Sequence, residues 1–223
     1  YILLALALLL LILFPAYIKE DSASATTGTA NSSSTSLTLT SGKNTASVAI
    51  TPTNASGAFA TSSSANKAEF GISTNNYTGY TLAITASDDT GNLVNASTND
   101  TIASITTNLT ESSFNTSANN NKWGFKPNKY VSNNAVITNT GDDSVYLPSP
   151  TTTPTLLDHT NVANSTANNY TIALGIRADH NTTAGTYSKT FTLVATANPI
   201  TYTINYNKNT TDTVSNLPST STT

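Results

Sequence analysis

Asparagines followed two positions later by Ser or Thr recur along this chain, and this tripeptide is the acceptor for N-linked glycans. Ser, Thr and Asn make up roughly two residues in five, and at this composition chance alone yields roughly nine such sequons. The composition is therefore more informative than any single site, and the sequons in predicted loops (Asn76, Asn115 and Asn181) are the first acceptors to expect. The eleven sequons stand at Asn31, Asn54, Asn76, Asn95, Asn99, Asn108, Asn115, Asn164, Asn169, Asn181 and Asn209.

Carboxylates in turns are the second group that could do chemistry. The aspartate pairs at 88–89 and 142–143 stand beside glycines and offer oxygen ligands of the kind that calcium prefers. Neither pair has the spacing of a dedicated calcium loop, so turn formation is the simpler interpretation. His159 and His180 lie far apart without a further ligand at metal-binding spacing. The sequence predicts no metal site and no cofactor.

Catalytic constellations are poorly represented. Serines are plentiful, but the G-x-S-x-G motif of a nucleophile elbow is absent. Glutamate occurs only at positions 20, 69 and 111, which offers little for a pair of catalytic carboxylates. We therefore predict that the protein is not an enzyme.

Two further side-chain groups invite a functional interpretation. Trp123 and Phe125 in NKWGFKPNKY suit either a sugar-stacking platform or a plug in a β-core, and the core is favoured. Lys189, in the last long predicted strand, is the first lysine to inspect for an isopeptide crosslink to Asn, which requires a buried lysine near an asparagine and a carboxylate.

The elements that must position these groups are strands. Apolar residues alternate at Leu37–Leu39, Ala46–Ile50, Phe70–Ile72, Tyr80–Ala86 and Tyr170–Ile176, and a period of two is typical of half-buried strands. Gly, Asn and Asp cluster between them at 41–44, 74–79, 88–92, 140–143 and 180–185. Nine or ten short strands at this spacing predict a mainly β fold, an antiparallel immunoglobulin-like β-sandwich.

Four regions follow from these patterns. Residues 1–18 are apolar and predict one hydrophobic α-helix for assembly or anchoring. Residues 19–35 have no periodicity and predict a polar stalk, and residues 36–199 carry the sandwich. Residues 200–223 begin with an alternating ITYTINYN and predict a last strand with a polar tail, or a strand that docks on a neighbouring subunit.

The opening helix has three interpretations. A Sec signal peptide is consistent with an apolar core followed by Ala23-Ser24-Ala25, which fits a small-residue cleavage site. A signal anchor is also consistent, although 18 residues at about 1.5 Å each barely reach the roughly 30 Å of a hydrocarbon core. A helix that is apolar all round also suits burial in a packed filament.

The stretch LILFPAYIKED resembles type IV pilins, where an apolar helix passes a proline into a polar region. In that family a peptidase cuts before the helix, and the helices pack along the filament axis. The resemblance implies an assembly helix formed by Ile2, Leu3, Leu4, Leu6, Leu8, Leu9, Leu10, Leu11, Ile12, Leu13, Phe14 and Pro15.

Three other stretches resemble bacterial surface proteins. TAGTYSKTFTLVATA is similar to a late strand of immunoglobulin-like surface domains. TNNYTGYTLAITAS, KWGFKPNKY and that strand, in this order, resemble Ser/Thr-rich surface proteins of small-genome bacteria, and YTINYNKNTTDTVSNLP is similar to the start of the β-grasp repeats of internalin-like proteins. These resemblances imply a surface location.

The sequence as a whole favours a structural subunit of an extracellular type IV pilus-like filament. The chain would be membrane-inserted before assembly, polymerise with copies of itself, and display a β-domain for adhesion, with glycans or a ligand on a host or neighbouring cell as partners. Nine Lys and Arg residues provide no basic stripe, so nucleic acid is excluded as a partner. The alternatives are a membrane-anchored or Sec-secreted monomeric adhesin and an S-layer or wall protein.

Overall fold

The computed structural model describes residues 35–141, 144–201, 203–204 and 221–222, and the fold of these residues is mainly β, as predicted. The predicted helix over 1–18, all but the last residue of the predicted stalk over 19–35, and most of the tail lie outside the described residues. The strands are β1 (Leu37–Lys43), β2 (Ala58–Thr61), β3 (Ala68–Thr74), β4 (Tyr80–Ala86), β5 (Leu93–Val94), β6 (Thr101–Ser104), β7 (Leu109–Thr110), β8 (Lys122–Pro127), β9 (Lys129–Ser132), β10 (Ala135–Thr138), β11 (Val145–Tyr146), β12 (Thr155–His159), β13 (Asn164–Ala178), β14 (Phe191–Ala197), β15 (Thr203–Ile204) and β16 (Ser221–Thr222).

Helical structure is slight in the described part of the chain. It consists of η1 (Ser64–Asn66), α1 (Glu111–Phe114) and η2 (Ser117–Asn119). Within this part, none of the helices has the length and apolar character needed to cross a membrane.

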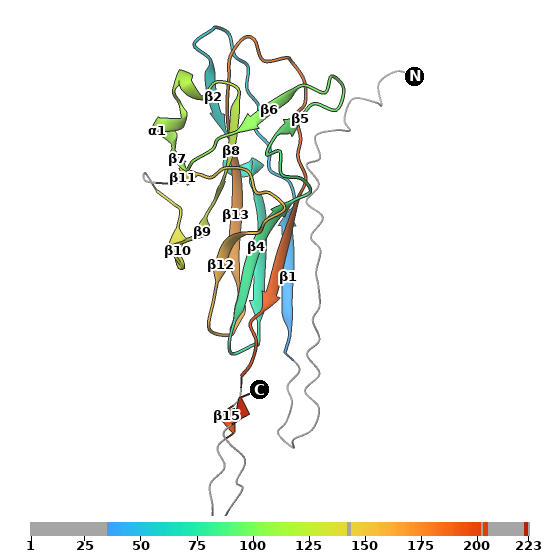
Figure 1. The fold of residues 1–223 in the computed structure, drawn as a ribbon, viewed down its shortest axis with the longest axis vertical. Helices are drawn as coiled ribbons and strands as arrows, with labels where there is room; N and C mark the ends of the chain where they lie inside the picture. Colours follow the sequence, from blue (N-terminus) through green and yellow to red (C-terminus); the bar gives the residue numbers. More distant parts are fainter. Residues whose placement is uncertain (1–34, 142–143, 202, 205–220, 223) are drawn as a thin grey trace, which may run out of the picture.

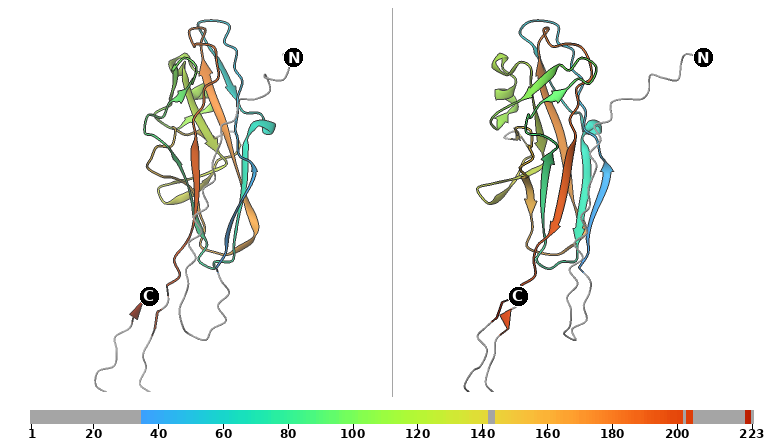
Figure 2. Two further views of the ribbon diagram at one scale, coloured as in Figure 1. Left: turned by 90° about the vertical axis from the view of Figure 1, so that its right-hand side faces the viewer. Right: turned by 45° about the vertical axis from the view of Figure 1, so that its right-hand side comes forward.

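Two sheets form the body of the domain and face each other across one core (Figures 1 and 2). The larger sheet has the strand order β1-β3-β13-β8-β6-β5, with β2 also paired to β13, and the smaller has the order β12-β4-β14. Phe70 of β3 and Tyr170 of β13 stack at 5.3 Å, and they share the core with Leu82 of β4 and Leu193 of β14. Strands with one apolar face each therefore bury that face against the opposite sheet.

The strand β4 confirms the predicted alternation, because every second residue from Tyr80 to Ala86 is buried. The central strand β13 differs, because all but one of the residues from Tyr170 to Ala178 are buried. Both faces of this part of the strand are therefore covered. A second cluster of Ile105, Phe114 and Tyr146 covers its outer face. The ring of Tyr146 lies where Gly175 has no side chain, since a Cβ built at Gly175 would stand 2.4 Å from the ring.

The prediction of a wholly antiparallel fold is wrong at one place. β6 and β8 pair in parallel, with Ala103 opposite Lys122 and Ser104 opposite Trp123. A parallel pair needs a long crossover connection. Residues 105–121, which include β7, α1 and η2, provide it.

The strand predicted over Ala46–Ile50 is also absent, since residues 44–57 form no strand. Ala46 is buried, and Val48 and Ile50 pack against the core from an irregular segment. The alternation here reflects contact with the core and not a hydrogen-bonded ladder.

The long strands run between two ends of the domain (Figure 1). We call the lower end the base. There the β3–β4 turn, residues 74–79, binds both the start of β1 and the residue after β14: the Ser36 carbonyl accepts from Thr74 Oγ1 at 2.7 Å, and the Asn198 carbonyl accepts from Asn76 Nδ2 at 2.8 Å. The opposite, distal end carries the β5–β6 and β13–β14 loops.

Candidate functional site

The distal end holds a concave polar site of about 350 Å³, which we call the distal polar pocket. Three separate segments form it: the β5–β6 loop with the start of β6, the residue before β8, and the β13–β14 loop. Its lining consists of Asn99, Asp100, Thr101, Asn121, Asn181, Thr182, Thr183 and Tyr187. Amides, hydroxyls, one carboxylate and one aromatic ring therefore converge on a single site.

A short bridge brings two of these loops together. The backbone of Val94, in β5, exchanges two hydrogen bonds of 3.0 Å with Ser188, so the β5–β6 loop lies beside the end of the β13–β14 loop. Asn95 then holds the β5–β6 loop closed: its backbone carbonyl accepts from Asn99 N at 2.8 Å, and its side-chain oxygen accepts from Ser97 N at 3.0 Å.

The third segment is tied to the β13–β14 loop by side chains. The Asn121 side-chain oxygen accepts hydrogen bonds from Thr182 Oγ1 and from the backbone N–H of Asp179. The Asp179 carboxylate accepts in turn from Asn181 N at 2.9 Å. These bonds fix the inner wall of the pocket before any ligand arrives.

Left-handed backbone geometry occurs at the same place. Asn99 and Asn121 have φ of 60° and 59°, and Gly185 has φ of 154°. A Cβ at Gly185 would stand 2.2 Å from Asn95 Nδ2, so only glycine lets this loop approach so closely. Sparsely populated conformations of this kind gather at binding sites, where the surrounding structure holds them.

Other polar groups of the pocket remain available. Among the described residues, the side chains of Asn99, Asp100 and Asn181 have no hydrogen-bond or ion-pair partner, although all three line the pocket. Tyr187 donates from its hydroxyl to the Thr183 carbonyl at 2.8 Å, which fixes the position of its ring. The site thus combines a fixed wall with free hydrogen-bonding groups at its rim.

The sequons fall into three groups in the structure. The side chains of Asn54, Asn99, Asn108, Asn115, Asn169 and Asn181 are exposed, and Asn164 is half-buried. Asn76 and Asn95 are buried, and Asn31 and Asn209 lie outside the described residues. Whether any of them carries a glycan stays a prediction.

Asn76 lies in a loop, as predicted, but its side chain is buried there. Asn76 is 1% exposed, and its Nδ2 donates to the carbonyls of Gly79 and Asn198 at 2.8 Å each. A glycan would replace one of these two hydrogens, so in the folded domain the side chain serves the turn. Asn115, whose side-chain oxygen accepts from the buried Arg177, and Asn181 are exposed as expected.

In the aspartate pair at 88–89, Asp88 makes a contact within its turn, as the simpler interpretation predicted: its Oδ1 accepts from Thr90 N at 2.9 Å. The pair also makes long-range contacts. Asp88 Oδ1 accepts from Lys189 Nζ at 2.7 Å, and Asp89 Oδ1 accepts from Thr152 N at 2.8 Å. The pair at 142–143 lies outside the described residues. In the described segments, no group of three or more His, Asp or Glu residues is placed to hold a metal ion.

Trp123 belongs to the core, which confirms the favoured interpretation over a sugar-stacking platform. It is 1% exposed, and its indole Nε1 donates to the Gly91 carbonyl at 2.9 Å. Phe125 is buried as well. Lys189 precedes β14 and is buried, but its partner is the Asp88 carboxylate and not an asparagine amide.

A buried chain of polar side chains, which no pattern in the sequence indicates, links the two sheets. Asn168 Nδ2 donates to the Tyr80 hydroxyl at 2.8 Å, the Tyr80 and Tyr170 hydroxyls are 2.5 Å apart, and Tyr170 donates to Asp158 Oδ2 at 2.6 Å. Lys129 Nζ approaches the same carboxylate oxygen at 3.1 Å. Burial, and then the hydrogen bond to Asp158, raise the pKa of Tyr170, so it remains a neutral donor.

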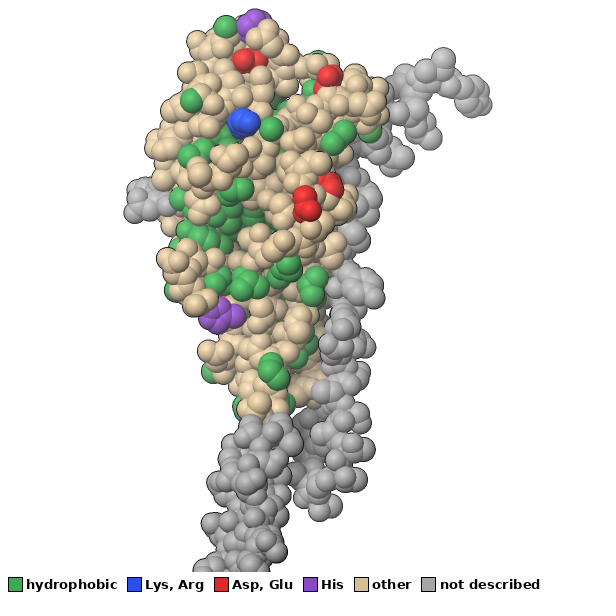
Figure 3. All heavy atoms as spheres, in the orientation of Figure 1, with side chains coloured by type: hydrophobic (Ala, Val, Ile, Leu, Met, Phe, Trp, Pro, Cys, Tyr) green, Lys and Arg blue, Asp and Glu red, His purple; other side chains and the backbone are tan. Residues whose placement is uncertain are grey.

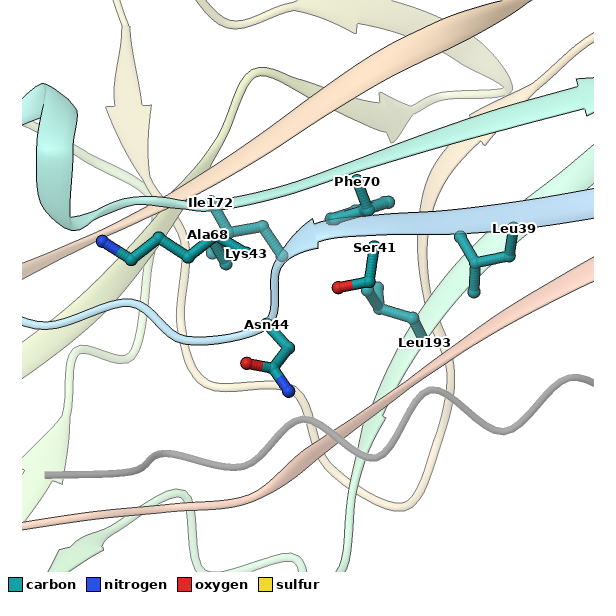
Figure 4. A pocket seen from close by; sticks show the side chains of 8 residues that line it. All are labelled: Leu39, Ser41, Lys43, Asn44, Ala68, Phe70, Ile172 and Leu193. Atoms are coloured by element: carbon teal, nitrogen blue, oxygen red, sulfur yellow. The ribbon is translucent and has the colours of Figure 1, made fainter. Parts of the chain in front are cut away.

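An apolar slot opens between the edges of the two sheets (Figure 4). Leu39 of β1, Phe70 of β3, Ile172 of β13 and Leu193 of β14 line it, with Lys43 at its rim. Its volume is about 20 Å³, enough for about one water molecule. It is a narrow gap in the core that is too small for a ligand.

Comparison with known proteins does not identify the chain. No protein-family model, no curated protein and no solved structure matches it.

Proposed function

We propose that this chain is a cell-surface protein that presents its β-domain by the base and binds other molecules or cells through the distal polar pocket. The observation that carries the proposal is the placement of the two ends of the domain's chain relative to the distal polar pocket. The chain enters β1 and leaves β14 at the base, and the distal polar pocket lies at the other end. A domain held by its base exposes this pocket to its surroundings.

The surface chemistry supports a location outside the cell. The face drawn in Figure 3 consists largely of uncharged polar groups with few charged side chains. Only 9% of the residues are charged, against an ordinary share of about a quarter. Hydroxyls and amides keep such a surface hydrated without a strong electrostatic field, which suits contact with neutral ligands. The finer immunoglobulin-like arrangement of the two sheets is part of this proposal.

The means of attachment stays a prediction, because residues 1–34 lie outside the described residues. Packing of Ile2–Pro15 with copies of itself would make the chain a subunit of a pilus-like filament. A signal anchor or Sec secretion would make it a monomeric adhesin, and lateral contacts between domains would make it an S-layer or wall protein. All of these present the distal end outward.

Antibody labelling tests the display. An antibody against residues 180–187, in the β13–β14 loop, is expected to label intact cells that produce the chain. Permeabilised cells provide the control that the chain is present. Labelling only after permeabilisation would overturn the proposal.

Electron microscopy of material sheared from these cells, with mass spectrometry of the N-terminal peptide, separates the modes of attachment. Filaments whose subunits retain Ile2–Pro15 support a pilus-like assembly. Single particles that begin near Thr26 support a secreted adhesin.

A further inference from the structure

The chemistry of the distal polar pocket specifies its ligand beyond the surface role proposed above, on which this inference rests. We propose that the pocket binds a neutral carbohydrate, one to three sugar units long, at the end of a glycan chain. The hydrogen-bonding groups, the charge, the aromatic ring and the size of the site all fit such a ligand.

The free side chains at the rim match the groups of a sugar. Each sugar hydroxyl both donates and accepts, and the amides of Asn99 and Asn181 offer a donor and an acceptor each. The Asp100 carboxylate accepts only, and it is half-buried without a partner among the described residues. A charge-assisted hydrogen bond from a sugar hydroxyl to this carboxylate is about twice as strong as a neutral one.

The charge of the lining excludes acidic ligands. No Lys or Arg is among the residues that line the pocket, and Asp100 contributes a negative charge. The Asp179 carboxylate lies behind the inner wall, where it receives the Asn181 backbone N–H. Phosphates, sulfates and uronic acids would meet a like charge without a compensating cation.

The ring of Tyr187 provides the apolar part of the site. It is half-buried, packs against the core and is held by its hydroxyl bond to Thr183. A fixed aromatic face with a polar edge suits the C–H groups of a pyranose ring. The volume of about 350 Å³ lies at the lower end of the roughly 300–1,000 Å³ of small-molecule sites.

Two of the rim asparagines, Asn99 and Asn181, are also exposed sequons. A glycan attached to either would occupy the rim of the pocket from which it grows. Binding of an external sugar therefore requires both side chains to be unmodified, so the test uses the full chain made in a host without N-glycosylation.

Isothermal titration of the full chain with maltotriose, mannotriose and chitotriose tests the proposal, with trigalacturonate as the acidic comparison. At least one neutral trisaccharide is expected to bind saturably. Asp100→Asn, which keeps the side-chain shape, and Tyr187→Ala are each expected to weaken this binding at least tenfold. Tyr77→Ala is the matched control, because Tyr77 is an exposed tyrosine at the base.

Circular dichroism checks that each variant folds. If Tyr187→Ala does not fold, Asp100→Asn still tests the proposal. Failure of all three neutral sugars to bind, a preference for trigalacturonate, or binding that both variants leave unchanged would overturn the carbohydrate proposal. Surface labelling by the antibody would still stand in that case, so the two proposals fail separately.

Discussion

At the scale of single residues, the chain of hydrogen bonds from Asn168 through Tyr80 and Tyr170 to Asp158 has one direction. Tyr170 donates to the carboxylate, so the Tyr80 hydroxyl must donate to Tyr170 and is free to accept from Asn168. Asp158 is 2% exposed and needs both Tyr170 and Lys129 as donors. A polar chain of this kind fixes how the two sheets face each other, since its members come from both.

Tyr170→Phe is expected to lower the free energy of unfolding by about 1–3 kcal/mol, because it leaves buried acceptors and donors unpaired. Tyr77→Phe, at an exposed tyrosine, is expected to change it little. Urea denaturation at neutral pH measures both. Equal stability of the Tyr170 variant and the parent would show that the chain of hydrogen bonds contributes nothing.

The pair of Lys189 and Asp88 predicts a response to acid. The hydrogen bond from Lys189, followed by that from Thr90, lowers the pKa of Asp88 from 3.8 to about 2. Because the folded state holds the carboxylate charged, the pair contributes its full stability above pH 3.8, and the contribution is lost as the pH falls through about 2.

Asp88→Asn is expected to destabilise the domain by about 1 kcal/mol at neutral pH, since Lys189 is buried and loses its charged partner, while solvent screens the half-exposed Asp88 carboxylate. The difference from the parent is expected to shrink as the pH is lowered towards the pKa of Asp88. Asp89→Asn, one residue along, provides the control with a smaller loss. Denaturation curves over the acid range decide, and a difference that does not depend on pH would contradict this assignment.

At the scale of elements, β13 and β8 are covered on both faces because glycines lie opposite each other in the ladder. Gly175 pairs with Gly124, and the absence of both side chains admits Tyr146 on one and Ile105 on the other. Ile105, the first residue of the excursion over residues 105–121, packs on the sheet in this space.

Gly175→Ala is expected to destabilise the domain by about 1–3 kcal/mol, because the new methyl would lie 2.4 Å from the Tyr146 ring and force it to move. Gly42→Ala is the matched strand control, where the nearest atom to a Cβ is 3.5 Å away. Thermal unfolding compares the two. A Gly175 variant as stable as the Gly42 variant would mean that Tyr146 repacks freely.

The elements also show which features the sequence can predict. The alternation in β4 is decided locally, by one buried face, and the prediction is confirmed there. The alternation over Ala46–Ile50 looks the same in the sequence but comes from contact with the core. An apolar period of two therefore does not by itself establish a hydrogen-bonded strand. The parallel β6–β8 pair depends on where a 17-residue excursion returns, which no local pattern records.

The candidate site was predictable only in parts. The sequons at Asn99 and Asn181 and the turn at 180–185 are visible in the sequence. Their meeting with Asn121 and Tyr187 depends on the bridge between Val94 and Ser188, which joins residues 94 positions apart. At Asn76 the sequence is misleading, because an asparagine in an accessible sequon and an asparagine buried in a turn cannot be told apart from the sequence.

At the scale of the whole molecule, the β3–β4 turn acts as a clamp at the base, where it holds the start of β1 and the residue after β14. Asn198 is the centre of this clamp: its Nδ2 donates to the carbonyls of Thr78 and Thr160 at 2.7 Å each, and its own carbonyl accepts from Asn76. The clamp joins the turn, the end of β14 and the residue after β12 into one unit.

Asn76→Ala and Asn198→Ala are each expected to cost about 1–3 kcal/mol of stability. Because both belong to one network, their effects are expected to be non-additive by about 0.5–3 kcal/mol in a double-mutant cycle. Asn54→Ala, at an exposed turn, is the control. Strict additivity of the two would show that the clamp is a set of independent contacts.

The clamp at the base also determines how the domain carries a pulling force. A ligand held in the distal polar pocket and a chain anchored at the base would stretch the domain along β13 and β14, whose ladder hydrogen bonds lie across the strands. A force along the strands loads all of these hydrogen bonds at once, whereas a force that pulls one strand away from its end breaks them one after another. The domain is thus expected to resist force best along the line that joins its base to the distal polar pocket.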